Sequence, residues 1–379
     1  MEDEIVSLLA LTRITGIGPV HTRTLLTAFG SAAAVFGADR SALQKCGLHD
    51  DLIEAILHYA GFSDLHAEIR YLRQNNIRIL RFDDAEYPRR LSALPYSPIV
   101  LFFQGNTTLN AKKVIAIAGT RTPTQHGIRM TEQFVRDLKQ PDLLVLSGLA
   151  FGIDAAAHQA ALAAGIPTIG VLGSGLNQIY PKEHWGLARS MVGQGGILSA
   201  APCNAKAALH SFPVRNQLIA AISDVLVVME TGLKGGSLSA ASAAELLHKP
   251  VFAAPGRMSD EKSYGCLGLI REKKATVLLS AAQVNAAMGW RQHANRPTHQ
   301  PSLPFDAIQH PEPSDPLPGT SAEEESLLTL LVGKDSIAFD DLVVLSRRRA
   351  PYLSSTLLGL ELRGQVRCLP GNRYCLAGR

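Results

Sequence analysis

Apolar positions between Glu4 and about Asn75 recur at the three- and four-residue spacing of a helix face. They include Ile5, Leu8, Leu9, Leu25, Leu26 and Phe29. Gly and Asp residues separate the runs and predict turns between short helices. The pattern therefore predicts a small helical domain over residues 1–75.

Two glycines of this segment are typical of a helix-hairpin-helix. Gly16 and Gly18 fall between two helical runs, and such glycines let a backbone amide approach a phosphate. A GxG by itself is a weak signal. An ordinary tight turn is the favoured interpretation, with DNA contact as the alternative.

Further along, apolar runs of strand length alternate with Ala-rich helical stretches. The runs are residues 114–119, 143–148, 168–173, 225–230 and 250–256. This alternation predicts βαβ units and a parallel sheet, and continuously apolar strands indicate helices on both faces. Shorter strand-like runs at 77–106 form a lead-in. The predicted fold class is α/β, a Rossmann-like doubly wound parallel sheet over residues 76–290.

The last part of the chain changes character twice. Seven prolines fall within residues 291–320, which predicts a linker without regular structure. Residues 321–379 then contain three short helical runs, followed by QVRCLPGNRYCLA, a hairpin turned at a glycine. This order predicts a C-terminal winged-helix domain.

Composition narrows the class of protein. Of the 379 residues, 46% are hydrophobic and 18% are charged, so a globular protein is expected. The net charge of +4 is compatible with a partner that carries phosphates, without requiring one. The acidic N-terminus opposes a secretory signal, and no apolar run is long enough to span a membrane. We expect a cytoplasmic protein without a membrane partner. The five cysteines show no metal or disulfide spacing.

Several loops that follow the predicted strands carry phosphate-binding chemistry. In a doubly wound sheet, ligands bind beyond the carboxyl ends of the strands. After the first strand, Gly119 permits close backbone approach, Thr120 offers a hydroxyl and an amide, and Arg121 can contact a phosphate. Lys182, which follows Tyr180 and Pro181, is a second candidate phosphate contact.

Two later segments extend this pattern. Phe212 can stack on a base, and Arg215 and Asn216 are expected to open a helix beside it. A second anion-binding turn precedes another helix and consists of Lys234, Gly235, Gly236 and Ser237. Its order is KGGS, so it is not a Walker A motif.

Other sites find less support. Asp154 fits a residue in the first turn of a helix that accepts hydrogen bonds from backbone amides. Asp154 and His158 are four residues apart, so they could face each other on that helix. A structural pair is favoured over a metal site or an acid–base pair. Dinucleotide binding is disfavoured, since Gln178 stands where a GxGxxG motif has its third glycine. No GxSxG, HExxH or carboxylate pair is evident. We therefore expect binding without catalysis, cofactor or metal.

These segments resemble the DprA/Smf family. The resemblance rests on YPRRL, LFFQG, GTR, SGLAFGID, AAH, IYPK, FPVRN, KGGSLSAASAA, PGRM and SYGCLGLI, in the order of the family, across residues 80–280. The resemblance extends more loosely to the C-terminal winged helix and to the N-terminal helices, for which it implies a SAM-like or helix-hairpin-helix-like domain. It also implies a homodimer that binds single-stranded DNA at the strand ends and loads the RecA recombinase during natural transformation. The implied DNA contacts are Gly119, Thr120, Arg121, Lys182, Phe212, Arg215 and Asn216, with Gly235, Gly236 and Ser237 a looser match.

The sequence departs from the family pattern at four positions. Gln217 replaces an arginine and Leu209 replaces a frequent lysine, which predicts fewer cations in the DNA groove. Ala200 replaces a glutamate and Leu267 replaces an asparagine.

Two alternative functions remain open. A phosphoribohydrolase-type enzyme would carry a PGGxGTxxE motif, whereas LKGGSLSAASAAE has Ser239 for the threonine and displaces the acid to Glu245. A winged-helix regulator of duplex DNA would use Arg347, Arg348 and Arg349, which precede the expected recognition helix.

A short apolar segment near the end of the sheet domain is the candidate dimer interface. It contains Leu267, Leu269 and Ile270, and the family resemblance places a homodimer contact nearby. Core packing is an equally good interpretation for each residue. Because adjacent helical residues point in different directions, at most one of Leu269 and Ile270 is expected centrally in an interface.

Overall fold

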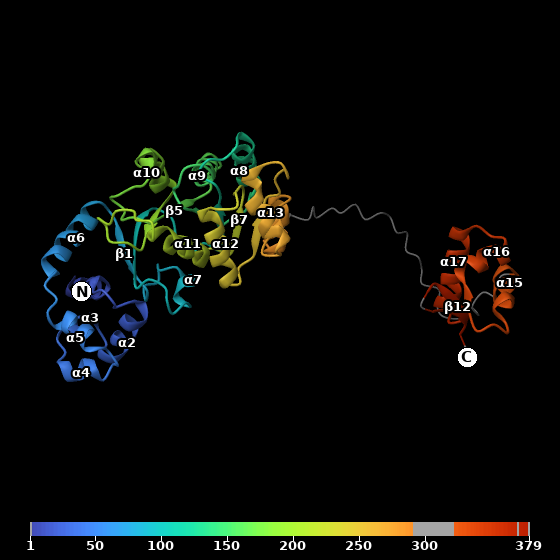
Figure 1. Ribbon diagram of the computed structural model, residues 1–379, viewed down its shortest axis with the longest axis horizontal. Helices are drawn as coiled ribbons and strands as arrows, with labels where there is room; N and C mark the ends of the chain where they lie inside the picture. The colour runs from blue at the N-terminus through green and yellow to red at the C-terminus, as the bar shows by residue number, and fades with distance from the viewer. Residues whose placement is uncertain (1, 291–321, 370, 378–379) are drawn as a thin grey trace, which may run out of the picture. The chain divides into compact units, whose positions relative to one another are not determined.

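The computed structural model describes residues 2–290, 322–369 and 371–377. It divides into two compact units, Met1–Pro297 and Thr298–Arg379 (Figure 1). The predicted linker at 291–320 lies outside the described residues.

The N-terminal segment is helical, as its apolar spacing predicts. Its helices are α1 (Glu2–Arg13), α2 (Pro19–Phe29), α3 (Ala32–Phe36), α4 (Arg40–Gln44), α5 (Asp50–Leu57) and α6 (Phe62–Gln74). The side chains of Ser31 and Asp39 accept backbone N–H groups and begin α3 and α4. The apolar faces of these helices share a cluster with Phe102 and Ile197 of the sheet. The helical segment and the sheet therefore form one unit with a continuous core.

A nine-stranded sheet organises this unit, in the order β1-β2-β6-β5-β4-β3-β7-β8-β9. Its strands are β1 (Arg78–Arg81), β2 (Val100–Gly105), β3 (Lys113–Ala118), β4 (Leu143–Ser147), β5 (Thr168–Leu172), β6 (Gly195–Ser199), β7 (Val225–Val228), β8 (Val251–Ala253) and β9 (Thr276–Val277). At one edge, β1 pairs antiparallel with β2, and β2 pairs antiparallel with β6. All other neighbouring strands in this order, from β6 through β3 to β9, pair parallel. The α/β fold class is confirmed.

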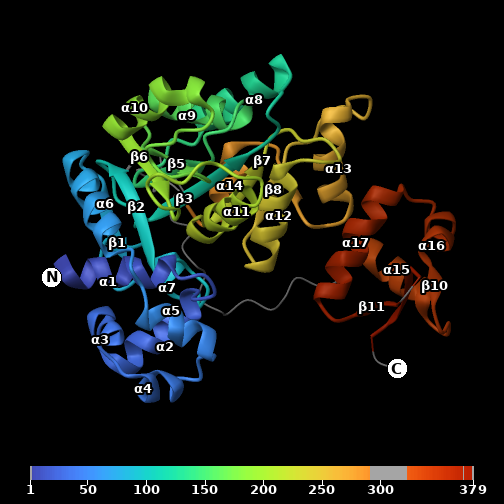
Figure 2. The same cartoon turned by 60° about the vertical axis from the view of Figure 1, so that its left-hand side comes forward.

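Helices cover both faces of the sheet (Figure 2). On one face, α11 (Ser211–Ile222), α12 (Gly236–Leu246) and α13 (Tyr264–Arg271) contribute to one apolar cluster, against which the short helix α7 (Arg89–Ser92) also packs. On the other face, α8 (Gln125–Asp137), α9 (Ile153–Ala163) and α14 (Ala281–Ala287) contribute to a second cluster. α10 (Trp185–Gln194) follows the short 3-10 turn η1 (Lys182–His184) and packs against α9, β2, β5 and β6. Its buried residues belong to the same apolar cluster as the N-terminal helices. A further 3-10 turn, η2 (Glu261–Ser263), precedes α13.

The topology predicts where a ligand binds. From β3 the chain proceeds outward through β4, β5 and β6 on one side, and through β7, β8 and β9 on the other. The direction of winding reverses at β3, and such reversals leave a crevice at the carboxyl ends of the strands.

The second unit has the order of a winged helix, as predicted. It contains α15 (Ala322–Leu331), β10 (Ile337–Ala338), α16 (Phe339–Ser346), α17 (Ala350–Leu362), β11 (Val366–Leu369) and β12 (Arg373–Leu376). The strands form an antiparallel sheet in the order β10-β12-β11. Leu327, Leu342, Leu353 and Leu357 form part of its core.

Candidate nucleic-acid interface

A groove with a volume of about 350 Å³ opens at the crevice beside β3. Its walls are the β3–α8 turn, the β4–α9 loop, one face of α11 and the β7–α12 loop. Ten of the predicted site residues line it: Gly119, Thr120, Arg121, Phe212, Arg215, Asn216, Lys234, Gly235, Gly236 and Ser237. The fold thus brings together side chains that lie more than 100 positions apart in the sequence.

The β3–α8 turn is held in place by backbone and carboxylate contacts. The amide of Thr120 donates to the carbonyl of Glu230 over 2.7 Å. The buried carboxylate of Glu230 accepts hydrogen bonds from the amide and hydroxyl of Thr124, which begins α8. A Cβ on Gly119 would lie 2.5 Å from Ile153 Cγ1. Gly119 is therefore required for packing against α9. It also lines the groove, and close approach of a ligand to its backbone stays a prediction.

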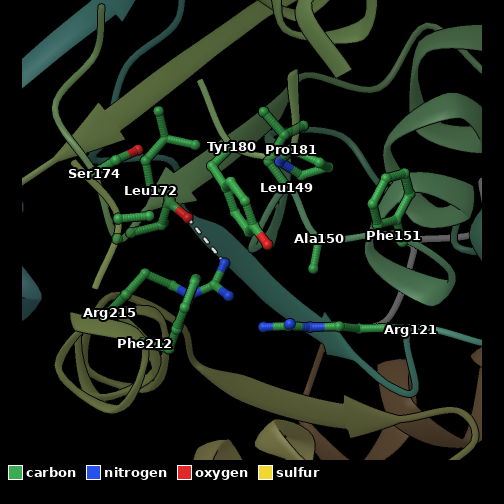
Figure 3. A pocket seen from close by; sticks show the side chains of 13 residues that line it. Arg121, Leu149, Ala150, Phe151, Leu172, Ser174, Tyr180, Pro181, Phe212 and Arg215 are labelled. Atoms are coloured by element: carbon green, nitrogen blue, oxygen red, sulfur yellow. Dashed lines mark hydrogen bonds between the residues drawn. The ribbon is translucent and has the colours of Figure 1, made fainter. Parts of the chain in front are cut away.

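Arg121 and Phe212 meet at the mouth of the groove. Arg121 is exposed, and its Cζ lies 5.1 Å from the centre of the Phe212 ring. Tyr180 approaches the same ring from the β5 side, with ring centroids 6.1 Å apart (Figure 3). A guanidinium over an aromatic face is held by cation–π attraction. The guanidinium and the ring therefore stack on each other at the mouth of the groove.

Arg215 occupies a different place from the one expected. α11 begins at Ser211, so Arg215 and Asn216 lie in its second turn and do not open the helix. Arg215 is only 9% exposed. Its Nη1 donates to the Val171 carbonyl over 3.1 Å and lies 4.0 Å from Asp154 Oδ2. The guanidinium passes so close to Gly148 that any Cβ there would overlap it.

Burial dominates the electrostatics of this pair. Burial raises the pKa of the Asp154 carboxyl, and the positive charge of Arg215 opposes this rise. Burial lowers the pKa of Arg215, and the Asp154 carboxylate opposes that shift. Since Asp154 offsets Arg215, the uncompensated positive charge in the groove rests mainly on Arg121 and Lys234.

The expected pairing of Asp154 with His158 was wrong. Asp154 lies in the first turn of α9 and accepts a hydrogen bond from the Ala150 amide over 3.3 Å, as the amide-accepting interpretation predicted. His158 is fully buried, and its Nδ1 lies 2.7 Å from the Thr168 hydroxyl. Burial lowers the pKa of His158 to about 3, so the ring is neutral at physiological pH.

The N-terminus of α12 closes the groove on the β7 side. Asn216 donates from its side chain to the Gly236 carbonyl over 2.9 Å, and the Ser237 hydroxyl donates to Thr231 Oγ1 over 2.7 Å. Lys234, Gly235 and Gly236 are exposed. The first N–H groups of a helix have no intrahelical partner and attract anions, so this turn is suited to a phosphate.

Three residues singled out from the sequence lie away from the groove. Lys182 is exposed at the start of η1, directly after Pro181, which lines an adjoining pocket. Gln217 lines a different, apolar hollow beside Tyr96. Leu209 is 90% exposed and does not line the groove. The substitution at Gln217 therefore removes no cation from the groove itself.

The structure adds residues that the sequence motifs did not indicate. Gly148 makes room for Arg215, and Glu230 holds the β3–α8 turn. Phe151, which is 44% exposed, lines the adjoining pocket. An aromatic residue within a glycine-rich loop was the only sequence signal for Phe151, and it does not distinguish a binding residue from a packed one.

The candidate dimer residues separate on α13. Leu269 is 7% exposed and belongs to the core, and Ile270 packs against the same cluster. The core-packing interpretation is thereby confirmed for Leu269, and its assignment to an interface was wrong. Leu267 is partly exposed and is the remaining candidate.

The winged helix carries its cations outside its recognition helix. α17 contains no Lys or Arg from Ala350 to Leu362, and its exposed residues include Tyr352, Leu358 and Leu362. Arg349 precedes the helix, and the Arg348 guanidinium lies 5.5 Å from the Tyr352 ring. Base readout in a major groove draws on polar and cationic side chains of this helix, so the duplex-regulator alternative loses support.

Two kinds of feature are absent from the residues that the structure describes. Among them, no group of three or more His, Cys, Asp or Glu side chains is placed to hold a metal ion. None of the described helices has both the length and the apolar character needed to cross a bilayer.

The fold and the groove define a class: a Rossmann-like binding domain joined to a winged helix. The chain belongs to the DNA recombination-mediator protein A family, whose model matches residues 78–289. The DprA winged helix domain model matches residues 311–372. The predicted membership in the DprA/Smf family is confirmed.

Individual relatives agree with this assignment. The Protein Smf of Synechocystis is 32% identical over 97% of both chains. The crystal structure of DNA processing protein A from Streptococcus pneumoniae superimposes with a TM-score of 0.66 at 27% identity, covering 77% of this chain and 99% of that one. DNA processing protein A from Helicobacter pylori, whose single-stranded DNA binding mode has been described, matches with a TM-score of 0.51 at 29% identity, covering 56% of this chain and 95% of that one.

Proposed function

We propose that the protein binds single-stranded DNA in the groove beside β3 and promotes loading of the RecA recombinase onto the bound strand in natural transformation and recombination. The observation that carries the DNA-binding proposal is the Arg121–Phe212 pair, 5.1 Å apart at the mouth of a groove that ends on the N-terminus of α12. Membership of the DNA recombination-mediator family supports the RecA step.

The groove offers each part of a nucleotide a suitable partner. Arg121, Lys234 and the first amides of α12 suit backbone phosphates. The ring of Phe212 suits the face of a base, which every base provides, so this contact is tolerant of sequence. In a duplex the base faces are covered by their neighbours. We therefore expect a preference for single strands.

The phosphoribohydrolase alternative requires an acid near the glycine turn. Glu245 is exposed and follows Gly236 by nine positions on α12. At 1.5 Å per residue it lies about 13 Å along the helix axis from Gly236, and it does not line the groove. This position supports a binding protein over a hydrolase.

Self-association is the second part of the proposal. We propose a homodimer that uses the α13 edge of the sheet, with Leu267 in the contact and two grooves available to one strand. Two linked grooves bind one long strand more tightly than a single groove does. A cytoplasmic location is proposed from the sequence.

A mobility-shift titration with one sequence as a single strand and as a duplex tests the DNA-binding proposal. We expect the single strand to bind more tightly and binding to weaken as salt rises, because phosphate contacts release counterions. Equal or tighter binding of the duplex would overturn the proposal. The RecA step is tested separately by RecA-dependent strand exchange on DNA coated with a single-strand-binding protein, where the protein should relieve the inhibition.

A further inference from the structure

A second hollow adjoins the DNA groove. Arg121, Phe212 and Arg215 line both hollows, so they share one wall. The far wall of the second hollow is built from the loops after β4 and β5, which contribute Phe151 and Tyr180. Figure 3 shows Phe151 on the opposite side of the hollow from Phe212. Tyr180 lies between them in this view, and its ring centroid is 6.1 Å from that of Phe212.

Both rings of the far wall are half exposed. Phe151 is 44% exposed and Tyr180 is 52% exposed. A single exposed aromatic is ordinary on a soluble protein. Two such rings at one rim, beside a cation and a third ring, match the stacking platforms of proteins that bind unpaired nucleic acid.

The Phe151 ring packs against His184. Its centroid lies 4.9 Å from that of His184 in an edge-to-face arrangement, and His184 Nδ1 lies 2.8 Å from the Leu149 carbonyl. The loop after β4 and the η1 turn after β5 thereby hold each other. A ring held in this way loses little entropy when a base stacks on it.

A cation accompanies the rings. Lys182 is exposed and follows Pro181, which lines the hollow. A nucleotide whose base lies on Phe151 or Tyr180 would have its phosphate near the loop that carries Lys182. Lys182 itself lines neither hollow, and its position directly after Pro181 is what places it near the rings.

We propose that Phe151 and Tyr180 form a second base-stacking subsite, which takes the next unpaired bases of a strand whose first nucleotide is held by Arg121 and Phe212. The subsite rests on the proposed DNA-binding function. Its ligand is an unpaired base of any sequence, with its phosphate near Lys182. Because the two hollows share Arg121, Phe212 and Arg215, the DNA strand would run along them from the β7 side to the β5 side of the sheet.

Strand length separates the two sites experimentally. Fluorescence polarisation with oligothymidylate of about 4 and about 12 nucleotides compares a strand that fills only the groove with one that reaches the subsite. We expect Phe151→Ala and Tyr180→Ala each to weaken binding of the long strand about 5-fold or more, the loss associated with one stacked base. Binding of the short strand should stay at the wild-type level.

Two further variants separate stacking from packing. Phe151→Leu keeps apolar bulk but has no π face, so it should lose as much affinity as Phe151→Ala, whereas Phe151→Trp should retain affinity. Tyr96→Ala is the matched control, because Tyr96 is 79% exposed and lines a different hollow; it should leave both strands unaffected.

Three outcomes would overturn the subsite. These are wild-type affinity of the Phe151 and Tyr180 variants for the long strand, equal losses for both strand lengths, and full affinity of Phe151→Leu. Failure of the wild-type protein to bind either strand would be a different result, since it would remove the proposed function together with the subsite.

Discussion

Arg215 and Asp154 form a charge pair behind the groove, with Nη1 and Oδ2 4.0 Å apart and both residues less than 10% exposed. Arg215 reaches this position because Gly148 has no side chain. The pair holds α11 against the β4–α9 loop, and both elements line the groove. We infer that Arg215 acts mainly by shaping the site, while Arg121 contacts the ligand.

The first prediction concerns the stability that this pair provides. Asp154→Asn should lower the free energy of unfolding by about 3 kcal/mol, because it leaves a buried guanidinium without its counter-charge. Combining Asp154→Ala with Arg215→Met should cost less than the two single changes together, since no buried charge remains. Urea unfolding followed by tryptophan fluorescence measures this, and both tryptophans, Trp185 and Trp290, lie in the sheet unit.

An exposed pair provides the control for that experiment. Arg136 and Glu132 lie 3.8 Å apart on α8, with side chains 52% and 38% exposed. Glu132→Gln should change the free energy of unfolding by less than about 1 kcal/mol. A similar small effect of Asp154→Asn would contradict the structural role of the buried pair.

The second prediction concerns Arg121. Arg121→Ala should weaken single-strand binding and reduce the slope of log K against log salt by about 0.7, the contribution of one phosphate contact. Arg129, which is exposed on α8, provides the matched control, and Arg129→Ala should leave slope and affinity unchanged. An unaltered slope in Arg121→Ala, measured by polarisation over a salt series, would argue against a phosphate contact at this position.

The third prediction concerns pH. The pKa of His158 is lowered from 6.5 to about 3 in the folded protein, so the unfolded chain takes up this proton first as pH falls. His158 therefore contributes stability that is complete above pH 6.5 and is lost progressively as pH falls toward 3. From about pH 7.5 to about pH 5, the loss attributable to His158 should be about 2 kcal/mol.

Comparison with two variants isolates this contribution. Asp154 acts in the opposite sense, because its raised pKa favours the folded state when it is protonated. His158→Gln should flatten the dependence of the free energy of unfolding on pH, whereas His126→Gln, at an exposed position on α8, should not. Identical pH profiles for wild type and His158→Gln would refute the assignment.

The fourth prediction concerns the proposed dimer. Leu267→Glu, at a partly exposed position, should yield a folded monomer by light scattering, with weaker binding of long single strands because the second groove is lost. Leu269→Glu should instead unfold the protein, since it places a charge in the core. A wild-type protein that is already monomeric would remove the dimer from the proposed function.

The sequence by itself determined the elements and their chemistry. Continuous apolar runs and their alternation with helical stretches predicted β3, β4, β5, β7 and β8, because a strand buried on both faces has no polar positions. The glycine- and cation-bearing turns predicted which loops line the groove, and motif order predicted the family. These signals are local, so a single sequence contains them.

Only the tertiary structure decided how individual side chains are used. The sequence placed Arg215 at a helix start, but the register of α11 against the sheet turns it under Gly148 and pairs it with Asp154. Leu267 and Leu269 look alike in the sequence and differ because one face of α13 packs on the core. The sequence does not distinguish a core from a surface position for Phe151, and the packing of the loops after β4 and β5 leaves its ring half exposed. Each depends on contacts between segments far apart in the chain, and no local pattern records the direction in which a side chain points when those segments pack.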